Sequence, residues 1–146
     1  MLIEALCAIL IFSFGVLGLV GLQTSATGQS GDAKLRSAAA ELADDYINQM
    51  WVANRASGAL KPVFQSGGTR YKTWLGNSST AGTVIATLPG VTATALTPTV
   101  TFTTLPSGCT TTCTTEVDVV MFWQTPHDLA QSTTHQYEVI AQISAY

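Results

Sequence analysis

The chain has 146 residues, of which 47% are hydrophobic and only 10% are charged, and its formal net charge is −3. This length fits one domain with a modest core, and the high apolar content excludes disorder throughout the chain. So few basic residues leave no electrostatic footprint for nucleic acid, and the mild acidic excess indicates no particular partner.

The N-terminal residues differ sharply from the rest, so we expect an apolar helix for a membrane or a filament core at 1–24. Residues 25–146 should continue this helix and form a globular head with a β-sheet. Residues 5–22 carry no charge, and Ser13 is the one polar residue among them. As a helix this run rises about 27 Å, close to the roughly 30 Å of a bilayer core. A cleaved secretory signal is disfavoured because no Lys or Arg precedes the run, and the residues before Cys7 do not form a lipobox. We therefore predict a membrane helix.

Glu4 is the first charged side chain, and it stands at the edge of this run. A carboxylate in an apolar medium is costly unless a cation meets it. The nearest cation is the α-amino group at Met1, or the same group of a neighbouring copy, and α-amines are charged at neutral pH. Such a pair would set the stagger between two apolar helices. The alternative is an acid favoured by the dipole of its own helix start.

Three glycines, Gly15, Gly18 and Gly21, recur every third residue in the apolar run. Each costs up to about 1 kcal/mol in a helix interior, so the stretch is easy to loosen. Small residues also let helices approach closely in an apolar medium. We expect a helix that sits in a membrane and then packs, or partly unwinds, in a bundle.

These features, in this order, resemble the mature N-terminus of type IV pilins: Met-Leu-Ile-Glu-Ala-Leu at 1–6, then Gly-Val-Leu-Gly-Leu-Val-Gly-Leu-Gln at 15–23. The Gly-Leu-Gln ending is most similar to PilV-type minor pilins and related pseudopilins. The resemblance covers about the first 25 residues. Two departures stand out: the family's glutamate is normally one place further from the mature N-terminus, and no proline lies near the end of the run. The first departure means that a residue precedes Met1 or that the spacing is shorter here.

The resemblance implies a prepilin cut by a dedicated peptidase and then N-methylated. It also implies an inner-membrane pool that pilus assembly machinery extracts into an extracellular filament. Its partners are further copies or homologous pilins. Glu4 corresponds to the family's glutamate, whose partner is the N-terminal amine of an adjacent subunit. The filament's task in this family ranges over adhesion, motility, DNA uptake and secretion.

After the apolar run, residues 24–32 are small and polar, and we expect a weakened helix that continues or bends. Residues 33–54 predict an amphipathic helix, with Asp32 as its N-cap. Its apolar stripe consists of Leu35, Ala39, Leu42, Tyr46, Met50 and Ala53. Its wet face holds Glu41, Asp44 and Asp45.

Residues 58–82 read as a loop that Tyr71 and Trp74 pin to the domain. Alternation then predicts four strands. They cover 83–88, 99–105, 116–123 and 136–144. The predicted fold class is α+β: a long N-terminal helix, apolar and then amphipathic, packed on a small antiparallel meander.

Cys109 and Cys113 lie in the turn between the second and third of these strands. Without a nearby Cys or His pair, a zinc site is poorly supported. A small disulfide-closed loop in an oxidising compartment fits better, and two free thiols are the alternative.

The inventory of catalytic and metal-binding groups is thin. His127, Asp128 and His135 fall in a predicted solvated loop with no metal-site spacing, and no hydrolase, metalloprotease or P-loop motif is present. We therefore expect no enzyme, no metal and no cofactor.

The leading hypothesis is a structural subunit of a type IV pilus, located in an extracellular filament with an inner-membrane pool. A minor pilin or a type II secretion pseudopilin is the first alternative. A single-pass membrane-anchored periplasmic binding module is the second, and Glu4→Ala separates it from the filament hypotheses.

Overall fold

The computed structural model describes residues 2–56, 58–109 and 113–145. The chain divides into two compact units, Met1–Leu35 and Arg36–Tyr146. This division falls later than the change of composition at residue 24. Met1 lies outside the described residues.

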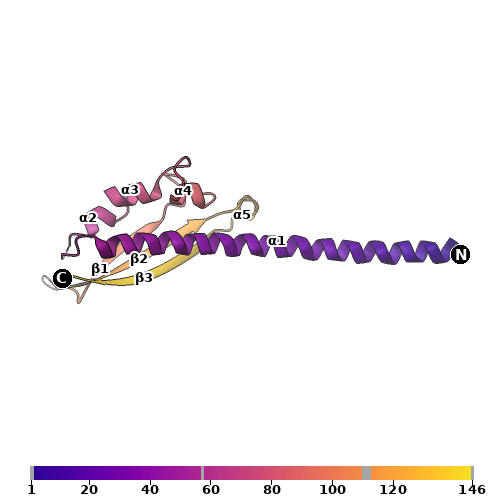
Figure 1. Cartoon of the computed structure of the whole chain (residues 1–146), viewed down its shortest axis with the longest axis horizontal. Coiled ribbons are helices and arrows are strands. Elements are labelled where there is room, and N and C mark those ends of the chain that lie inside the picture. Colours follow the sequence, from indigo (N-terminus) through magenta and orange to yellow (C-terminus); the bar gives the residue numbers. More distant parts are fainter. Residues whose placement is uncertain (1, 57, 110–112, 146) are drawn as a thin grey trace. The chain divides into compact units, whose positions relative to one another are not determined.

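One long helix, α1 (Leu2–Val52), covers the whole first unit and continues into the second (Figure 1). Residues 24–32 are helical, so Asp32 is a helix-interior residue and the predicted N-cap is wrong: a cap needs non-helical backbone before it. Two threonines support this polar stretch. Thr24 Oγ1 donates to the Val20 carbonyl at 3.0 Å, and Thr27 Oγ1 donates to the Gln23 carbonyl at 3.1 Å.

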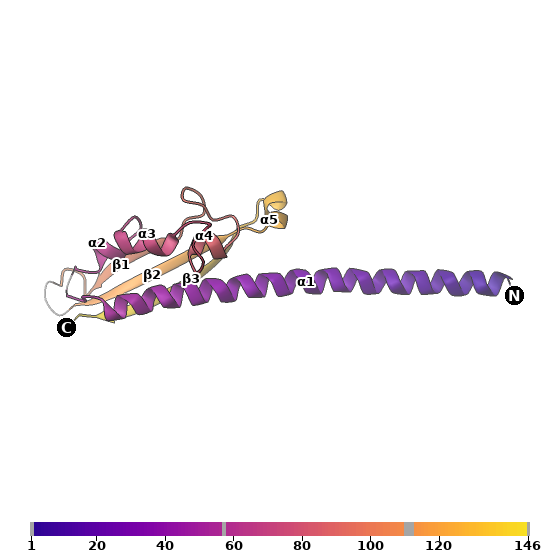
Figure 2. The ribbon, with the colours of Figure 1, turned by 45° about the horizontal axis from the view of Figure 1, so that its top comes forward.

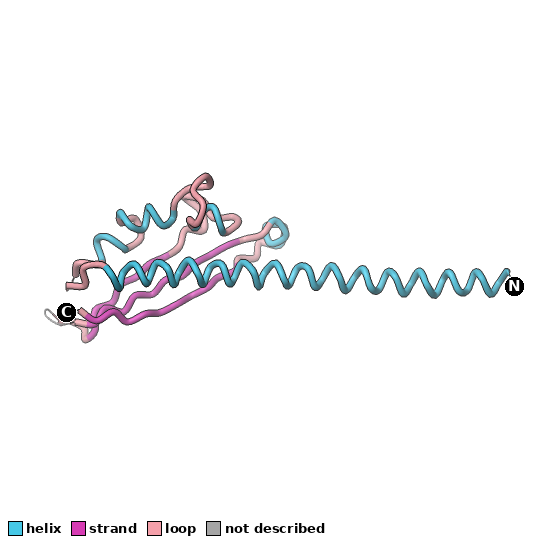
Figure 3. The backbone as a smooth tube through the Cα atoms, in the orientation of Figure 1, coloured by secondary structure: helices cyan, strands magenta, loops and turns pink. Residues whose placement is uncertain are grey.

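In the second unit, three short helices follow α1: α2 (Lys61–Phe64), α3 (Thr69–Leu75) and α4 (Val84–Thr87). Figure 3 shows them as separate helical turns along the connection to the sheet. The predicted loop at 58–82 thus contains α2 and α3, and the predicted strand at 83–88 is wrong because its centre is α4. Gly76 ends α3 with φ 65, and a Cβ there would collide with Thr83. Only glycine fits this left-handed, crowded position.

The sheet has three antiparallel strands in the order β1 (Thr99–Leu105), β2 (Thr114–Trp123) and β3 (His135–Ser144). Three of the four predicted strands are confirmed, and β2 begins two residues earlier than predicted. A further helix, α5 (Pro126–Gln131), joins β2 to β3. The C-terminal part of α1 runs alongside this sheet in both views (Figures 1 and 2), so the α+β layout is confirmed.

Strand alternation gives the sheet one buried face. In β2 every second residue from Val117 to Trp123 is buried, and Val100 of β1 and Ile143 of β3 share that face. The predicted stripe of α1 supplies the opposing side chains, with Ala43 and Ile47 widening it. The buried residues of α1 are Ala39, Leu42, Ala43, Tyr46, Ile47 and Met50.

An aromatic cluster ties α1 to the short helices. The Tyr46 and Trp74 rings stack at 4.1 Å, and Trp74 Nε1 donates to the Leu42 carbonyl at 3.0 Å. Tyr46 donates from its hydroxyl to the Phe64 carbonyl at 2.7 Å, and Tyr71 donates likewise to Pro98 at 2.6 Å. Burial raises the pKa of both tyrosines. Tyr71 and Trp74 therefore pin the connection to the domain as predicted, from a helix rather than from a loop.

Candidate functional site: the apolar half of α1

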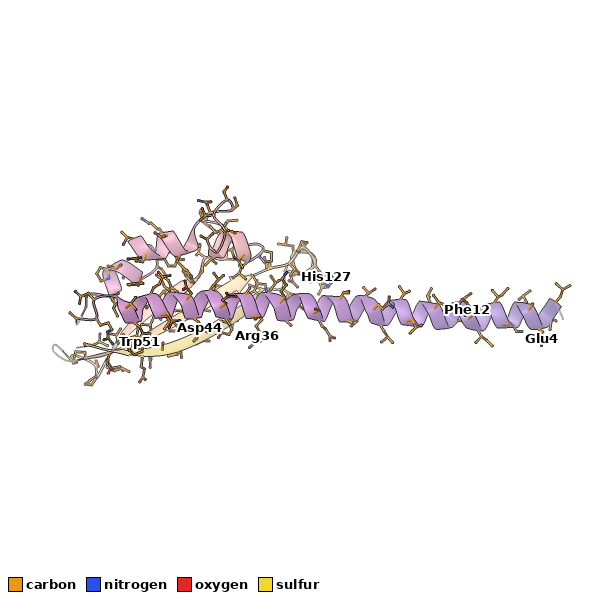
Figure 4. The ribbon with its side chains drawn as sticks, viewed as in Figure 1. Glu4, Phe12, Arg36, Asp44, Trp51 and His127 are labelled. Carbon is orange, nitrogen blue, oxygen red and sulfur yellow. A yellow bond between two sulfur atoms is a disulfide. The ribbon has the colours of Figure 1, made fainter. Side chains whose placement is uncertain are left out.

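The candidate site is the part of α1 within the first unit. Every residue from 2 to 35 except Leu35 is exposed in the single chain. The large apolar side chains among them include Leu2 at 90%, Ile3 at 79% and Phe12 at 72% exposure. Figure 4 shows Glu4 and Phe12 projecting outward from this helix. An apolar patch of this extent is far larger than a soluble monomer normally exposes.

Within this part of α1, residues 5–22 are apolar on all sides of the helix, not on one stripe, whereas residues 24–32 are small and polar. Such a helix belongs inside a membrane or inside a bundle. By length and composition α1 is long and apolar enough to cross a membrane. Ser13, the polar residue of the run, donates its hydroxyl to the Ile9 carbonyl at 2.7 Å. Its hydrogen-bonding group is thus satisfied within the helix, as an apolar surrounding demands.

Glu4 lies in the first turn of α1 and is exposed. No ion pair of Glu4 occurs within the described part of the chain. Its predicted partner at Met1 lies outside the described residues. The pairing of Glu4 with an α-amine, in its own chain or a neighbour, therefore stays a prediction.

The three glycines of the run are helical, and a Cβ built at Gly15, Gly18 or Gly21 would meet nothing within 4 Å. Packing inside the single chain therefore does not require them. Their predicted roles, loosening the helix and admitting a close neighbour, concern partners and stay predictions.

The second predicted feature, the disulfide between Cys109 and Cys113, is present with a Cα–Cα distance of 5.8 Å. It closes the connection between β1 and β2, whose middle residues lie outside the described ranges. Cys113 is buried, and its carbonyl accepts a hydrogen bond from Ala145 N at 3.0 Å. One end of the bridge thus lies beside Ala145, just after β3. Cys7 is a free, exposed thiol.

The expected solvated loop around His127, Asp128 and His135 is correct only in part. His127 is exposed but lies on α5, whereas Asp128 is buried on α5 and His135 is partly buried at the start of β3. Asp128 forms the capping box of α5, where its Oδ2 accepts from Thr125 N at 2.8 Å and from Thr125 Oγ1 at 2.6 Å. These bonds, helped by nearby His135, lower the pKa of Asp128 to about 2. His135 begins β3, stacks on Trp123, and places Nε2 at 3.2 Å from Asp128 Oδ2, an ion-pair distance without hydrogen-bond geometry. Asp128 therefore serves as part of the N-terminal cap of α5.

His127 lies apart from this cluster, with Nε2 at 3.0 Å from Gln131 Nε2. Within the described residues, no group of three His, Cys, Asp or Glu side chains is placed to hold a metal ion. The acidic residues Glu41, Asp44 and Asp45 of α1 are exposed, as predicted.

No protein-family model, curated protein or solved structure matches the chain. What the chain does must therefore be inferred from its own residues.

Proposed function

We propose that the chain is a structural subunit of a type IV pilus-like filament, polymerising through the apolar half of α1. One observation carries the proposal: residues 5–22 are uncharged and exposed on every side of their helix, while the second unit has its own core. The second unit folds around Tyr46, Met50 and the sheet, and the described residues of this segment are exposed.

The segment needs an apolar environment, and two are available to it in turn. Burying one large aliphatic or aromatic side chain contributes about 1.5–3 kcal/mol. A bilayer provides an apolar environment for a single chain, so unassembled subunits would reside in the inner membrane. A bundle of identical helices provides it again, with closer packing, once the subunits leave the membrane for an extracellular filament.

Glu4 supplies the specificity that apolar surfaces lack. Residues 1–31 contain no Lys, Arg or His side chain, so a free α-amino group at the mature N-terminus is the cation that we propose as the partner of Glu4. Lys34, the first basic side chain, stands about 45 Å further along the helix at 1.5 Å per residue. An unpaired carboxylate inside a bundle is strongly destabilising, so a subunit finds its stagger where Glu4 meets a neighbour's α-amine.

The test replaces Glu4 by Ala in the full chain, in cells that produce it. We expect sheared surface filaments to fall at least about tenfold while the membrane pool persists, because the register pair is lost but the head is untouched. The matched control is Asp32→Ala, which removes an exposed acid of the same helix outside the apolar run. Normal filaments from the Glu4→Ala chain would contradict the proposed role of this residue.

The membrane-length helix also fits a single-pass anchored periplasmic binding module that never polymerises. In that case Glu4→Ala is silent and the native chain yields no filaments. A minor pilin or secretion pseudopilin shares the same helix. Its mark is a low amount of this chain relative to the main shaft protein in purified filaments.

A further inference from the structure

Charges in the second unit are segregated along the chain. Between Asp45 and Glu116 the chain contains four basic residues and no acidic one. The basic residues are Arg55, Lys61, Arg70 and Lys72. After them no Lys or Arg occurs, and the acidic residues lie on the sheet and on α5. The connection that carries α2 and α3 is thus positive, and the sheet is negative.

A hollow of about 330 Å³ opens where α1 ends and the chain turns into α2. Its lining is largely apolar and includes Val52, Val63 and Phe64. Phe64 is buried, whereas Val52 is 87% exposed, so part of the lining is well packed and part is open to solvent. A water molecule takes about 30 Å³ of liquid, so the hollow has room for a guest the size of a side chain.

Arg70 of α3 also lines this hollow. It is exposed and makes no ion pair within the described part of the chain. A planar guanidinium beside an apolar depression favours a carboxylate that arrives with an apolar side chain next to it.

The outer face of the sheet carries a carboxylate beside an exposed apolar side chain. Ile140 of β3 is 57% exposed, and the strand register places Asp118 of β2 directly opposite it. Glu138, two residues before Ile140, lies on the same face by strand alternation. One oxygen of Asp118 is covered and has no hydrogen-bond partner among the described residues. Asp118 makes no ion pair among the residues that the structure describes.

We propose that Ile140 of one copy enters the hollow of a second copy, where Arg70 pairs with Asp118 of the first. The inference rests on the proposed filament function. The two surfaces differ, so the contact is heterologous, and a repeated heterologous contact that does not close builds an open helical array. Such a contact is smaller than a stable interface of about 1,000 Å² or more, so it acts alongside the packing of the apolar helices.

Charge reversal tests the pairing in the full chain. R70E and D118R each place like charges together, and we expect each to lower sheared filament at least about tenfold relative to the membrane pool. The double variant R70E/D118R restores the opposite signs and should return filament to within about threefold of native. K72E is the control, because Lys72 makes the same charge change on α3 and is not part of the hollow.

Cross-linking gives a second readout, which reports the proximity of residues 70 and 118 in two copies and not the sign of their charges. In a Cys7→Ser background, R70C/D118C treated with a short bismaleimide cross-linker should form dimers and higher ladders on denaturing gels, and K72C/D118C should not. A linker is needed because an arginine–aspartate pair holds its Cα atoms beyond the roughly 7 Å limit of a direct disulfide. Normal filaments without ladders, with R70E and D118R behaving like K72E, would overturn the contact and leave the filament proposal intact. A native chain that yields no filaments, with no ladders from the cysteine pair, would overturn both.

Discussion

Tyr46→Phe removes one oxygen from the centre of the head and nothing else. The Tyr46 side chain is fully buried, and its hydroxyl donates to the Phe64 carbonyl at 2.7 Å. The ring remains in the variant, so the stack on Trp74 at 4.1 Å is kept. The change therefore isolates one hydrogen bond between α1 and the end of α2.

The free energy of unfolding should fall by about 1–2 kcal/mol in this variant. A typical buried hydrogen bond contributes about 1 kcal/mol net, and an acceptor left without its donor raises the cost. With a urea m-value of about 2 kcal/mol per molar, the middle of the range for small domains, the midpoint shifts by roughly 0.5–1 M.

The same residue sets an alkaline limit on stability. Burial raises the pKa of Tyr46 in the folded state, so the unfolded chain loses this proton first as the pH rises. Stability is full below pH about 10 and declines above it, by at most about 1.4 kcal/mol per pH unit for one such group. Phenylalanine has no proton to lose. The difference in free energy of unfolding between the native chain and Tyr46→Phe should therefore become smaller above pH 10.

The assay is urea unfolding of the full chain in detergent micelles, followed by tryptophan fluorescence at pH 8 and at pH 11. Tyr137→Phe is the matched control, since Tyr137 lies on β3 and its hydroxyl makes no hydrogen bond within the described residues. A Tyr46→Phe chain as stable as Tyr137→Phe, or a gap that does not change with pH, would refute this account of the core.

Two further predictions concern the ends of the sheet. Reduction of Cys109–Cys113, or Cys109→Ser with Cys113→Ser, should lower the free energy of unfolding by about 2 kcal/mol, the value expected for so short a closed loop; an unchanged denaturation midpoint under reductant would contradict this. Asp128→Asn should destabilise the head at neutral pH, because the pKa of Asp128 is lowered to about 2 by bonds made to its charged form. The stabilisation is full above pH about 4 and is lost as the pH falls toward 2, so the native and variant unfolding curves should converge there. Glu138→Gln serves as the control. A difference in stability between the native and Asp128→Asn chains that persists at pH 2 would contradict the stabilising role of the charged Asp128 carboxylate.

Much of the fold could be predicted from the regular spacing of apolar residues along the chain. The stripe on α1 and the alternation in β1, β2 and β3 each give one face a continuous apolar surface, and such patterns survive tertiary packing. The helix α3 was predictable in the same way. Tyr71, Trp74 and Leu75 stand at spacings of three and four, and Gly76 follows as a stop signal. Gly67 and Gly68 stand directly before this helix, and a glycine pair is typical of a loop.

Other features depend on contacts that no local pattern reveals. Val84 and Ile85 favour a strand by propensity, yet Val84 is buried in the single turn of α4. Asp32 resembles a cap, but the helix is already formed before it. The hollow beside Arg70 combines residues of α1, α2 and α3, so it exists only in the folded head. The apolar part of α1, in contrast, was evident from composition alone, because residues 5–22 carry no charge.

The most direct test of the filament proposal is a helical reconstruction, by cryo-electron microscopy, of filaments sheared from producing cells. The proposal predicts side-chain density for this chain along the shaft, with residues 2–22 in the filament core and Glu4 beside the α-amine of an adjacent copy. A shaft built from another protein, or this chain's apolar helix found outside the core with Glu4 facing solvent, would contradict it.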